Sequence, residues 1–110
     1  MLKRRMFTLS LTLCSLTAFG ANENTGQVEI TSIENWSATE ALLVTTNQVT
    51  KNNPASCSAP GKYSLPASSS DFSRSMLLSA FATNKQVMLT IWDGGCVVNN
   101  PQIVSVKFSN

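Results

Sequence analysis

Hydrophobic and polar positions change their period in the second half of the chain. Between residues 71 and 84, apolar side chains recur at the spacing of an amphipathic helix. Ser68–Asp71 offers side-chain oxygens to the free N–H groups of a first helical turn, and Asn84 can adopt the left-handed conformation that ends helices. The predicted apolar stripe consists of Phe72, Met76, Leu77, Ala80 and Phe81. From Val87 to Trp92 the period becomes two, which predicts a strand.

Four other segments have the alternation or composition of strands. They are Gln27–Ile33, with a bulge or bend near Thr31-Ser32, and Glu40–Gln48, Tyr63–Leu65 and Gln102–Phe108. Residues 22–26 are polar, and we expect them to fray. Residues 51–62 are rich in proline and asparagine, which predicts a long loop.

This order, strand-strand-strand-helix-strand-strand, makes the chain mainly β with one helix (α+β). A single helix between the third and fourth of five strands is the arrangement of a five-stranded OB-like barrel. A small open α+β sheet with the helix across one face has the same order. We favour the barrel.

The first twenty residues have the features of a secretory signal peptide. Lys3, Arg4 and Arg5 precede an apolar run, and Ala18-Phe19-Gly20 supplies the small residues that a signal peptidase requires. We expect cleavage after Gly20, with Ala21 as the alternative. The run is shorter than the ~20 residues that span a bilayer, which argues against a membrane anchor. We therefore predict a signal peptide at 1–20, one OB-like domain at 21–110 without a membrane span, and a secreted or periplasmic location.

Removing the leader changes both the charge and the cysteine count. Three of the eight basic residues lie in the leader, so five basic and six acidic residues remain, a net charge of −1. Without a basic patch, nucleic-acid binding is not expected. Cys57 and Cys96 remain, and we expect them to form a disulfide in an oxidising compartment. Closing this loop would stabilise the fold by ~4 kcal/mol on the chain-entropy model.

The sequence has no signature of catalysis. It contains no histidine, so the nucleophile arrangements that depend on this residue are excluded. No cluster has metal-ligand spacing, and no cofactor motif is present. We predict that the protein is not an enzyme and uses neither metal nor cofactor.

Binding is the function class that the expected loops favour. OB barrels bind through the loop between strands one and two, the loop between strands four and five, and the face between them. An exposed tryptophan beside amide and hydroxyl groups could stack on a sugar ring. Alternatively, Trp36 folds back to cap the barrel and the asparagines only make turns. The candidate ligand-binding residues are Asn35, Trp36, Ser37, Asp93, Asn99 and Asn100.

Residues 75–91, preceded by Cys57 and followed by Cys96, resemble the B subunit of subtilase cytotoxin and its small secreted relatives. The shared pattern is a helix, a short turn and an alternating strand. The resemblance implies an OB-like barrel and a homo-oligomer such as a pentameric ring. The toxin subunits bind glycans, but their sugar-contacting residues near the first strand have no match in residues 27–34, so glycan binding is not carried over from the resemblance. We expect an exported, non-catalytic domain that binds a cell-surface glycan or a protein partner. The alternative is a periplasmic or secreted protein-interaction module without a sugar ligand.

Overall fold

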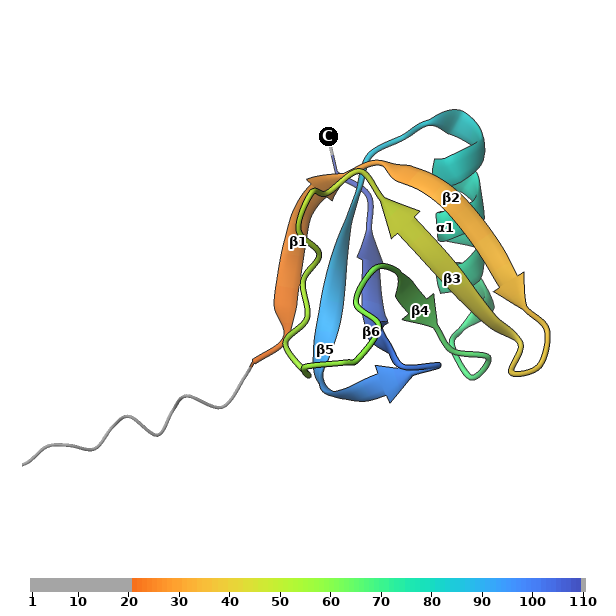
Figure 1. The fold of residues 1–110 in the computed structure, drawn as a ribbon. Helices are drawn as coiled ribbons and strands as arrows, with labels where there is room; N and C mark the ends of the chain where they lie inside the picture. Colours follow the sequence, from red (N-terminus) through yellow and green to blue (C-terminus); the bar gives the residue numbers. More distant parts are fainter. Residues whose placement is uncertain (1–20, 110) are drawn as a thin grey trace, which may run out of the picture.

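The computed structural model describes residues 21–109, so the predicted signal peptide at 1–20 lies outside the described residues. A curved sheet carries one helix against its side (Figure 1). The elements in chain order are β1 (Glu23–Val28), β2 (Ile30–Trp36), β3 (Ala41–Thr46), β4 (Tyr63–Leu65), α1 (Asp71–Thr83), β5 (Val87–Val97) and β6 (Asn100–Lys107).

The sheet has six strands in the order β1-β5-β6-β4-β3-β2. Its pairs are antiparallel except β4 and β6, which are parallel. The predicted class, mainly β with one helix, is therefore confirmed. The prediction of five strands is wrong, and the sheet is open, because no pairing joins β1 to β2 within residues 21–109.

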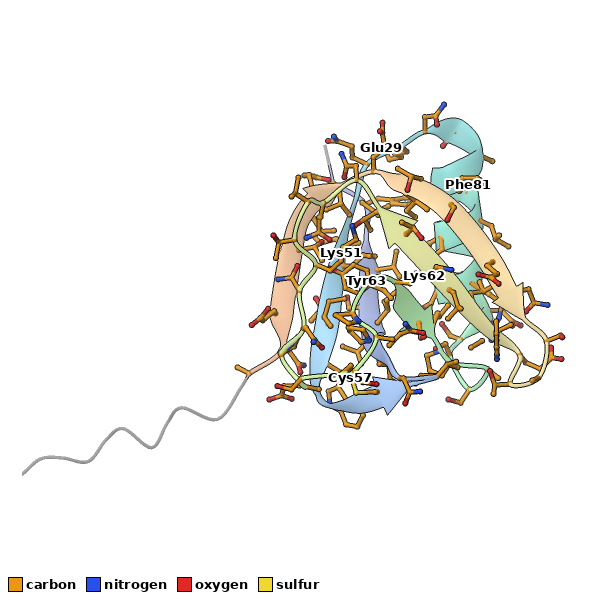
Figure 2. The ribbon with its side chains drawn as sticks, viewed as in Figure 1. Glu29, Lys51, Cys57, Lys62, Tyr63 and Phe81 are labelled. Carbon is orange, nitrogen blue, oxygen red and sulfur yellow. A yellow bond between two sulfur atoms is a disulfide. The ribbon has the colours of Figure 1, made fainter. Side chains whose placement is uncertain are left out.

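The sixth strand arises at Glu29, where one predicted strand is divided into β1 and β2. The Glu29 N–H donates to Asn47 Oδ1 at 3.0 Å, and the Asn47 N–H donates to the Glu29 carbonyl at 3.0 Å. Before this point the chain pairs with β5, and after it with β3. Figure 2 shows Glu29 where the two strands meet. Residues 23–28 do not fray, because their backbone completes the ladder of β5.

The predicted bend near Thr31-Ser32 is confirmed, since the register of β2 shifts between Ile30 and Ser32. A second departure concerns Asp93–Gly95, because an aspartate followed by two glycines is a pattern typical of a turn. These residues lie inside β5, and its register with β6 shifts between Ile91 and Cys96. The turn itself is Val98-Asn99, with φ of 53° and 64°.

The core lies between the inner face of the sheet and α1. Its buried residues are Val28, Ile30, Leu42, Val44, Tyr63, Leu65, Leu77, Ala80, Val87, Leu89, Ile91 and Ile103. From the helix, only Leu77 and Ala80 are buried. Phe72 and Phe81 of the predicted stripe are 81% and 42% exposed, so the buried strip of α1 is narrower than the pattern predicts.

Both helix ends follow the sequence signals. Ser70 Oγ accepts a hydrogen bond from the Ser73 N–H at 3.2 Å, which caps the first turn. Asn84 takes a φ of 57°, and the following Lys85 N–H donates to the Ala80 carbonyl at 3.0 Å. These caps determine where α1 starts and ends.

The long loop between β3 and β4 is held by a disulfide and by hydrogen bonds, among them those of a buried tyrosine. The predicted disulfide is confirmed: Cys57 and Cys96 are joined, with their Cα atoms 5.9 Å apart. The buried Tyr63 hydroxyl donates to Gln48 Oε1 at 2.8 Å and accepts from the Asn52 N–H at 2.7 Å. Figure 2 shows Tyr63 in the interior and Cys57 at the tip of the loop, away from Tyr63. In the described part of the chain, no helix is long and apolar enough to cross a membrane.

Candidate ligand-binding site

A hollow of about 430 Å³ lies between the β2–β3 turn and the first turns of α1. Asn35 and Glu40 contribute to it from the ends of the hairpin, Leu42 from β3, Ala67 from the β4–α1 connection and Arg74 from the helix. Four segments that are separate in the sequence therefore meet there. The lining contains an amide, a carboxylate and a guanidinium beside two apolar side chains.

Strand register places the inner part of this hollow. Asn35 and Leu42 are direct cross-strand partners, so their side chains lie on the same face of the hairpin. Leu42 belongs to the core and is 8% exposed, whereas Asn35 is exposed. The hollow thus has an apolar floor continuous with the core and an amide at its rim.

Arg74 is held in place by the chain segment that precedes its helix. Its Nη2 donates to the Ala67 carbonyl at 2.8 Å and approaches the Pro66 carbonyl at 3.5 Å. A guanidinium has five N–H groups. Within residues 21–109, no acceptor is found for Nε or Nη1, so three donors remain for a ligand. Arg74 is thus both positioned by the protein and able to bind something else.

Glu40 stands in a strained backbone conformation. It ends a turn in which the Thr39 N–H donates to the Trp36 carbonyl at 3.1 Å, and its φ is 57°. A residue with a Cβ in this left-handed region costs about 1–2 kcal/mol, and glycine or asparagine is usual there. Strained residues cluster at active sites, ligand clamps and switch regions. Glu40 lines the hollow, so its carboxylate is the group that this strain would retain.

The structure separates the candidate residues of the first loop. Asn35 lines the hollow. Trp36 follows it in the strand and so projects from the opposite face, where its cross-strand partner Ala41 is fully buried. Trp36 as a whole is 42% exposed, and Ser37 is exposed in the turn. Only one of these three residues therefore lies in the hollow.

The candidates of the second loop lie at the far end of β5 and β6 and do not line this hollow. The Asp93 N–H donates to Asn22 Oδ1, and the Asn99 carbonyl accepts from the Ala59 N–H. Asn100 is 7% exposed, and its Nδ2 donates to the Ala59 carbonyl at 2.7 Å. The side chain of Asn100 is thus used inside the protein, to hold the β3–β4 loop.

Sequence reasoning missed Glu40 and Arg74. Arg74 has the sequence position of an outward-facing helical residue, and Glu40 was expected to begin a strand. The available signal was the hairpin itself: two strands joined over residues 37–40 need a left-handed residue near the end of the turn. Which helical residue faces that turn depends on how α1 packs, and no local pattern shows it.

The described residues contain no group of three or more metal-ligating side chains. No family model, curated protein or solved structure matches this chain. The chemical character of the hollow is therefore the basis for a function.

Proposed function

We propose that this protein is an exported, non-catalytic domain that binds a saccharide in the hollow formed by Asn35, Glu40, Leu42, Ala67 and Arg74. One observation carries the proposal: a carboxylate held on strained backbone stands in the same hollow as an amide and a partly unpaired guanidinium. Nothing in the described packing requires a glutamate at this left-handed position. A ligand that uses its carboxylate supplies the reason.

A saccharide fits this set of groups because its hydroxyls both donate and accept hydrogen bonds. Carboxylate oxygens accept, guanidinium N–H groups donate, and an amide does both. Hydrogen bonds to charged groups are the stronger ones. The apolar surfaces of Leu42 and Ala67 can pack against the C–H face of a sugar ring, since small-molecule sites combine apolar walls with a few placed polar groups.

The architecture supports an OB-like assignment as part of the same proposal. β1 and β2 are joined through Glu29 alone and stand at the two ends of the strand order. If they are counted as one bent strand, five strands follow in a ring, with the helix between the third and the fourth. This arrangement agrees with the resemblance to toxin B subunits.

The disulfide supports export. Disulfides form and persist in oxidising compartments, and the Cys57–Cys96 bond joins a loop to a strand 39 residues away. Together with the leader-like sequence at 1–20, it favours a secreted or periplasmic location.

A glycan array probed with the oxidised protein tests the proposal. We expect binding to a restricted set of glycans, and Asn35→Ala should weaken it about tenfold, as expected for the loss of one hydrogen-bonding side chain. Asn24→Ala is the matched control, because it removes an exposed asparagine of a strand outside the hollow. Equal binding by both variants would refute the site, and no binding to any glycan would refute the saccharide.

A second candidate function is contact with another protein, including assembly with further copies of this chain. The observation that favours it is the exposure of three large apolar side chains of α1: Phe72, Leu78 and Phe81 are 81%, 48% and 42% exposed. Phe81 is visible on the helix in Figure 2. Light scattering of the oxidised protein should then show a pentamer-sized species that Phe72→Ser lowers to a monomer. A wild-type monomer would refute self-assembly.

A further inference from the structure

The two charged groups of the hollow come from the two elements that flank it. Glu40 ends the β2–β3 turn, and Arg74 belongs to the N-terminal part of α1. Within residues 21–109 the ion pair is Lys62–Glu34, with 2.9 Å between Nζ and Oε1, and Glu40 and Arg74 do not form one. A carboxylate and a guanidinium therefore line one space without contacting each other.

Both groups are fixed by the chain that carries them. The Arg74 guanidinium donates to the Ala67 carbonyl at 2.8 Å, and the backbone of Glu40 is held in the left-handed conformation that ends the turn. A carboxylate only accepts hydrogen bonds, and a guanidinium only donates them. A ligand group that lies between them must therefore present a donor to Glu40 and an acceptor to Arg74.

The hollow also has an apolar part. Leu42 is 8% exposed and Ala67 is exposed, and neither side chain can form a hydrogen bond. A polar group placed against these carbons without a partner loses its hydrogen bonds to water. The ligand group that fits therefore has an apolar end in addition to its donor and its acceptor.

We infer that the ligand is an N-acetylated sugar and that the hollow binds its acetamido group. This inference rests on the proposed function and adds the class of sugar to it. In a trans secondary amide the N–H and the C=O point in opposite directions. The N–H can donate to Glu40 while the carbonyl accepts from Arg74, and the methyl group packs against Leu42 and Ala67.

Other substituents at the same position of a sugar match the hollow less well. A hydroxyl has no methyl group to cover the apolar carbons. A free amine is protonated at neutral pH, so it places a cation near Arg74 and offers it no acceptor. Asn35, at the rim of the hollow, remains for the hydroxyls of the sugar ring, so it contributes to every sugar that binds.

The test measures the affinity of the oxidised protein for five monosaccharides by calorimetry: N-acetylglucosamine, N-acetylgalactosamine, glucose, galactose and glucosamine. We expect the two N-acetylated sugars to bind about tenfold more tightly than glucose and galactose, because they gain a hydrogen bond to a charged group and an apolar contact. Glucosamine should bind no more tightly than glucose.

Two variants assign this preference to the hollow. Ala67→Ser makes an exposed apolar side chain polar and keeps the backbone carbonyl that holds Arg74, so it should weaken the N-acetylated sugars about threefold and leave glucose unchanged. Glu40→Gln removes the charge that accepts the amide N–H and should weaken the N-acetylated sugars about tenfold. Ala59→Ser, at an exposed alanine of the β3–β4 loop outside the hollow, is the matched control and should bind every probe as the wild type does.

The outcomes separate this inference from the proposed function. If glycans bind and Asn35→Ala weakens them, but N-acetylated and parent sugars bind equally, the proposed function stands and the acetamido inference is overturned. An equal effect of Ala67→Ser on glucose, or of Ala59→Ser on the N-acetylated sugars, overturns it in the same way. If the protein binds no glycan, or if Asn35→Ala has no effect, the proposed function is overturned, and the acetamido inference with it.

Discussion

Replacing Glu40 by glycine tests whether the β2–β3 turn retains strain for the sake of its carboxylate. Glu40 has a φ of 57°, where a side chain with a Cβ costs about 1–2 kcal/mol. Glycine removes this cost, but its unfolded chain has more conformational freedom, which costs about 0.5–1 kcal/mol. The net expectation is that Glu40→Gly stabilises the domain by about 0.5–1 kcal/mol.

A gain of this size is measurable by thermal unfolding. For a domain of this length, 1 kcal/mol shifts Tm by roughly 4–8 °C, so Glu40→Gly should raise Tm by about 2–8 °C. Glu40→Gln is the matched control, because it removes the charge and keeps the backbone strain. Its Tm should equal that of the wild type. Both variants should lose affinity for a saccharide that binds the wild type, since neither retains the carboxylate.

The stability and binding measurements refute different parts of this reasoning. A Tm of Glu40→Gly at or below the wild-type value would show that the turn is not strained. A Tm of Glu40→Gln as high as that of Glu40→Gly would assign the gain to the lost charge. If both variants bind the saccharide as the wild type does, the Glu40 carboxylate does not take part in binding, and the proposed reason for the strained backbone is refuted.

Three further predictions concern stability. Burial raises the pKa of Tyr63 above its ordinary value of 10.0, so the stability that this side chain contributes is full below pH 10 and declines as the pH rises through the higher folded pKa. Because Tyr63 is the only tyrosine, the absorbance of tyrosinate should report its titration. A titration midpoint at or below pH 10 would contradict the raised pKa. Replacing both Cys57 and Cys96 by serine should lower the free energy of unfolding by ~4 kcal/mol in urea denaturation, and a loss under about 1 kcal/mol would refute the loop-closure account. Val98→Asn should raise that free energy by about 1 kcal/mol, because a β-branched residue at a φ of 53° is replaced by one that tolerates it; a decrease would show that the valine side chain contributes more by its packing.

The sequence predicted the features that depend on residues close together in the chain, and it missed the features that depend on contacts between distant residues. The ends of α1 were predicted from the Ser68–Asp71 run and Asn84, because caps act within one helical turn. The cysteine pair was predicted because only two cysteines follow the leader. In contrast, the division of one strand at Glu29 depends on Asn47, which directly follows β3 and which no local pattern connects with Glu29.

The candidate site shows the same distinction. Asn35 was predicted from its place beside a loop, and it does line the hollow. Its neighbours Trp36 and Ser37 were predicted with it because they are adjacent in sequence. Trp36, however, projects from the opposite face of the strand, and Ser37 lies in the turn beyond it. Glu40 and Arg74 were missed because their meeting depends on the hairpin register and on the rotation of α1 against the sheet.

By itself, the amino-acid sequence determined a mainly β chain with one capped helix, a disulfide, and the absence of histidine chemistry, because each of these follows from residue type and short-range spacing. Only the tertiary structure decided the number of strands, their open order and the residues that share the hollow. Strand pairing and helix packing bring together groups that are tens of residues apart. One pairing is favoured over the others by the packing of the whole core, and no single local segment determines it. A hollow built from such contacts exists only once the chain has folded.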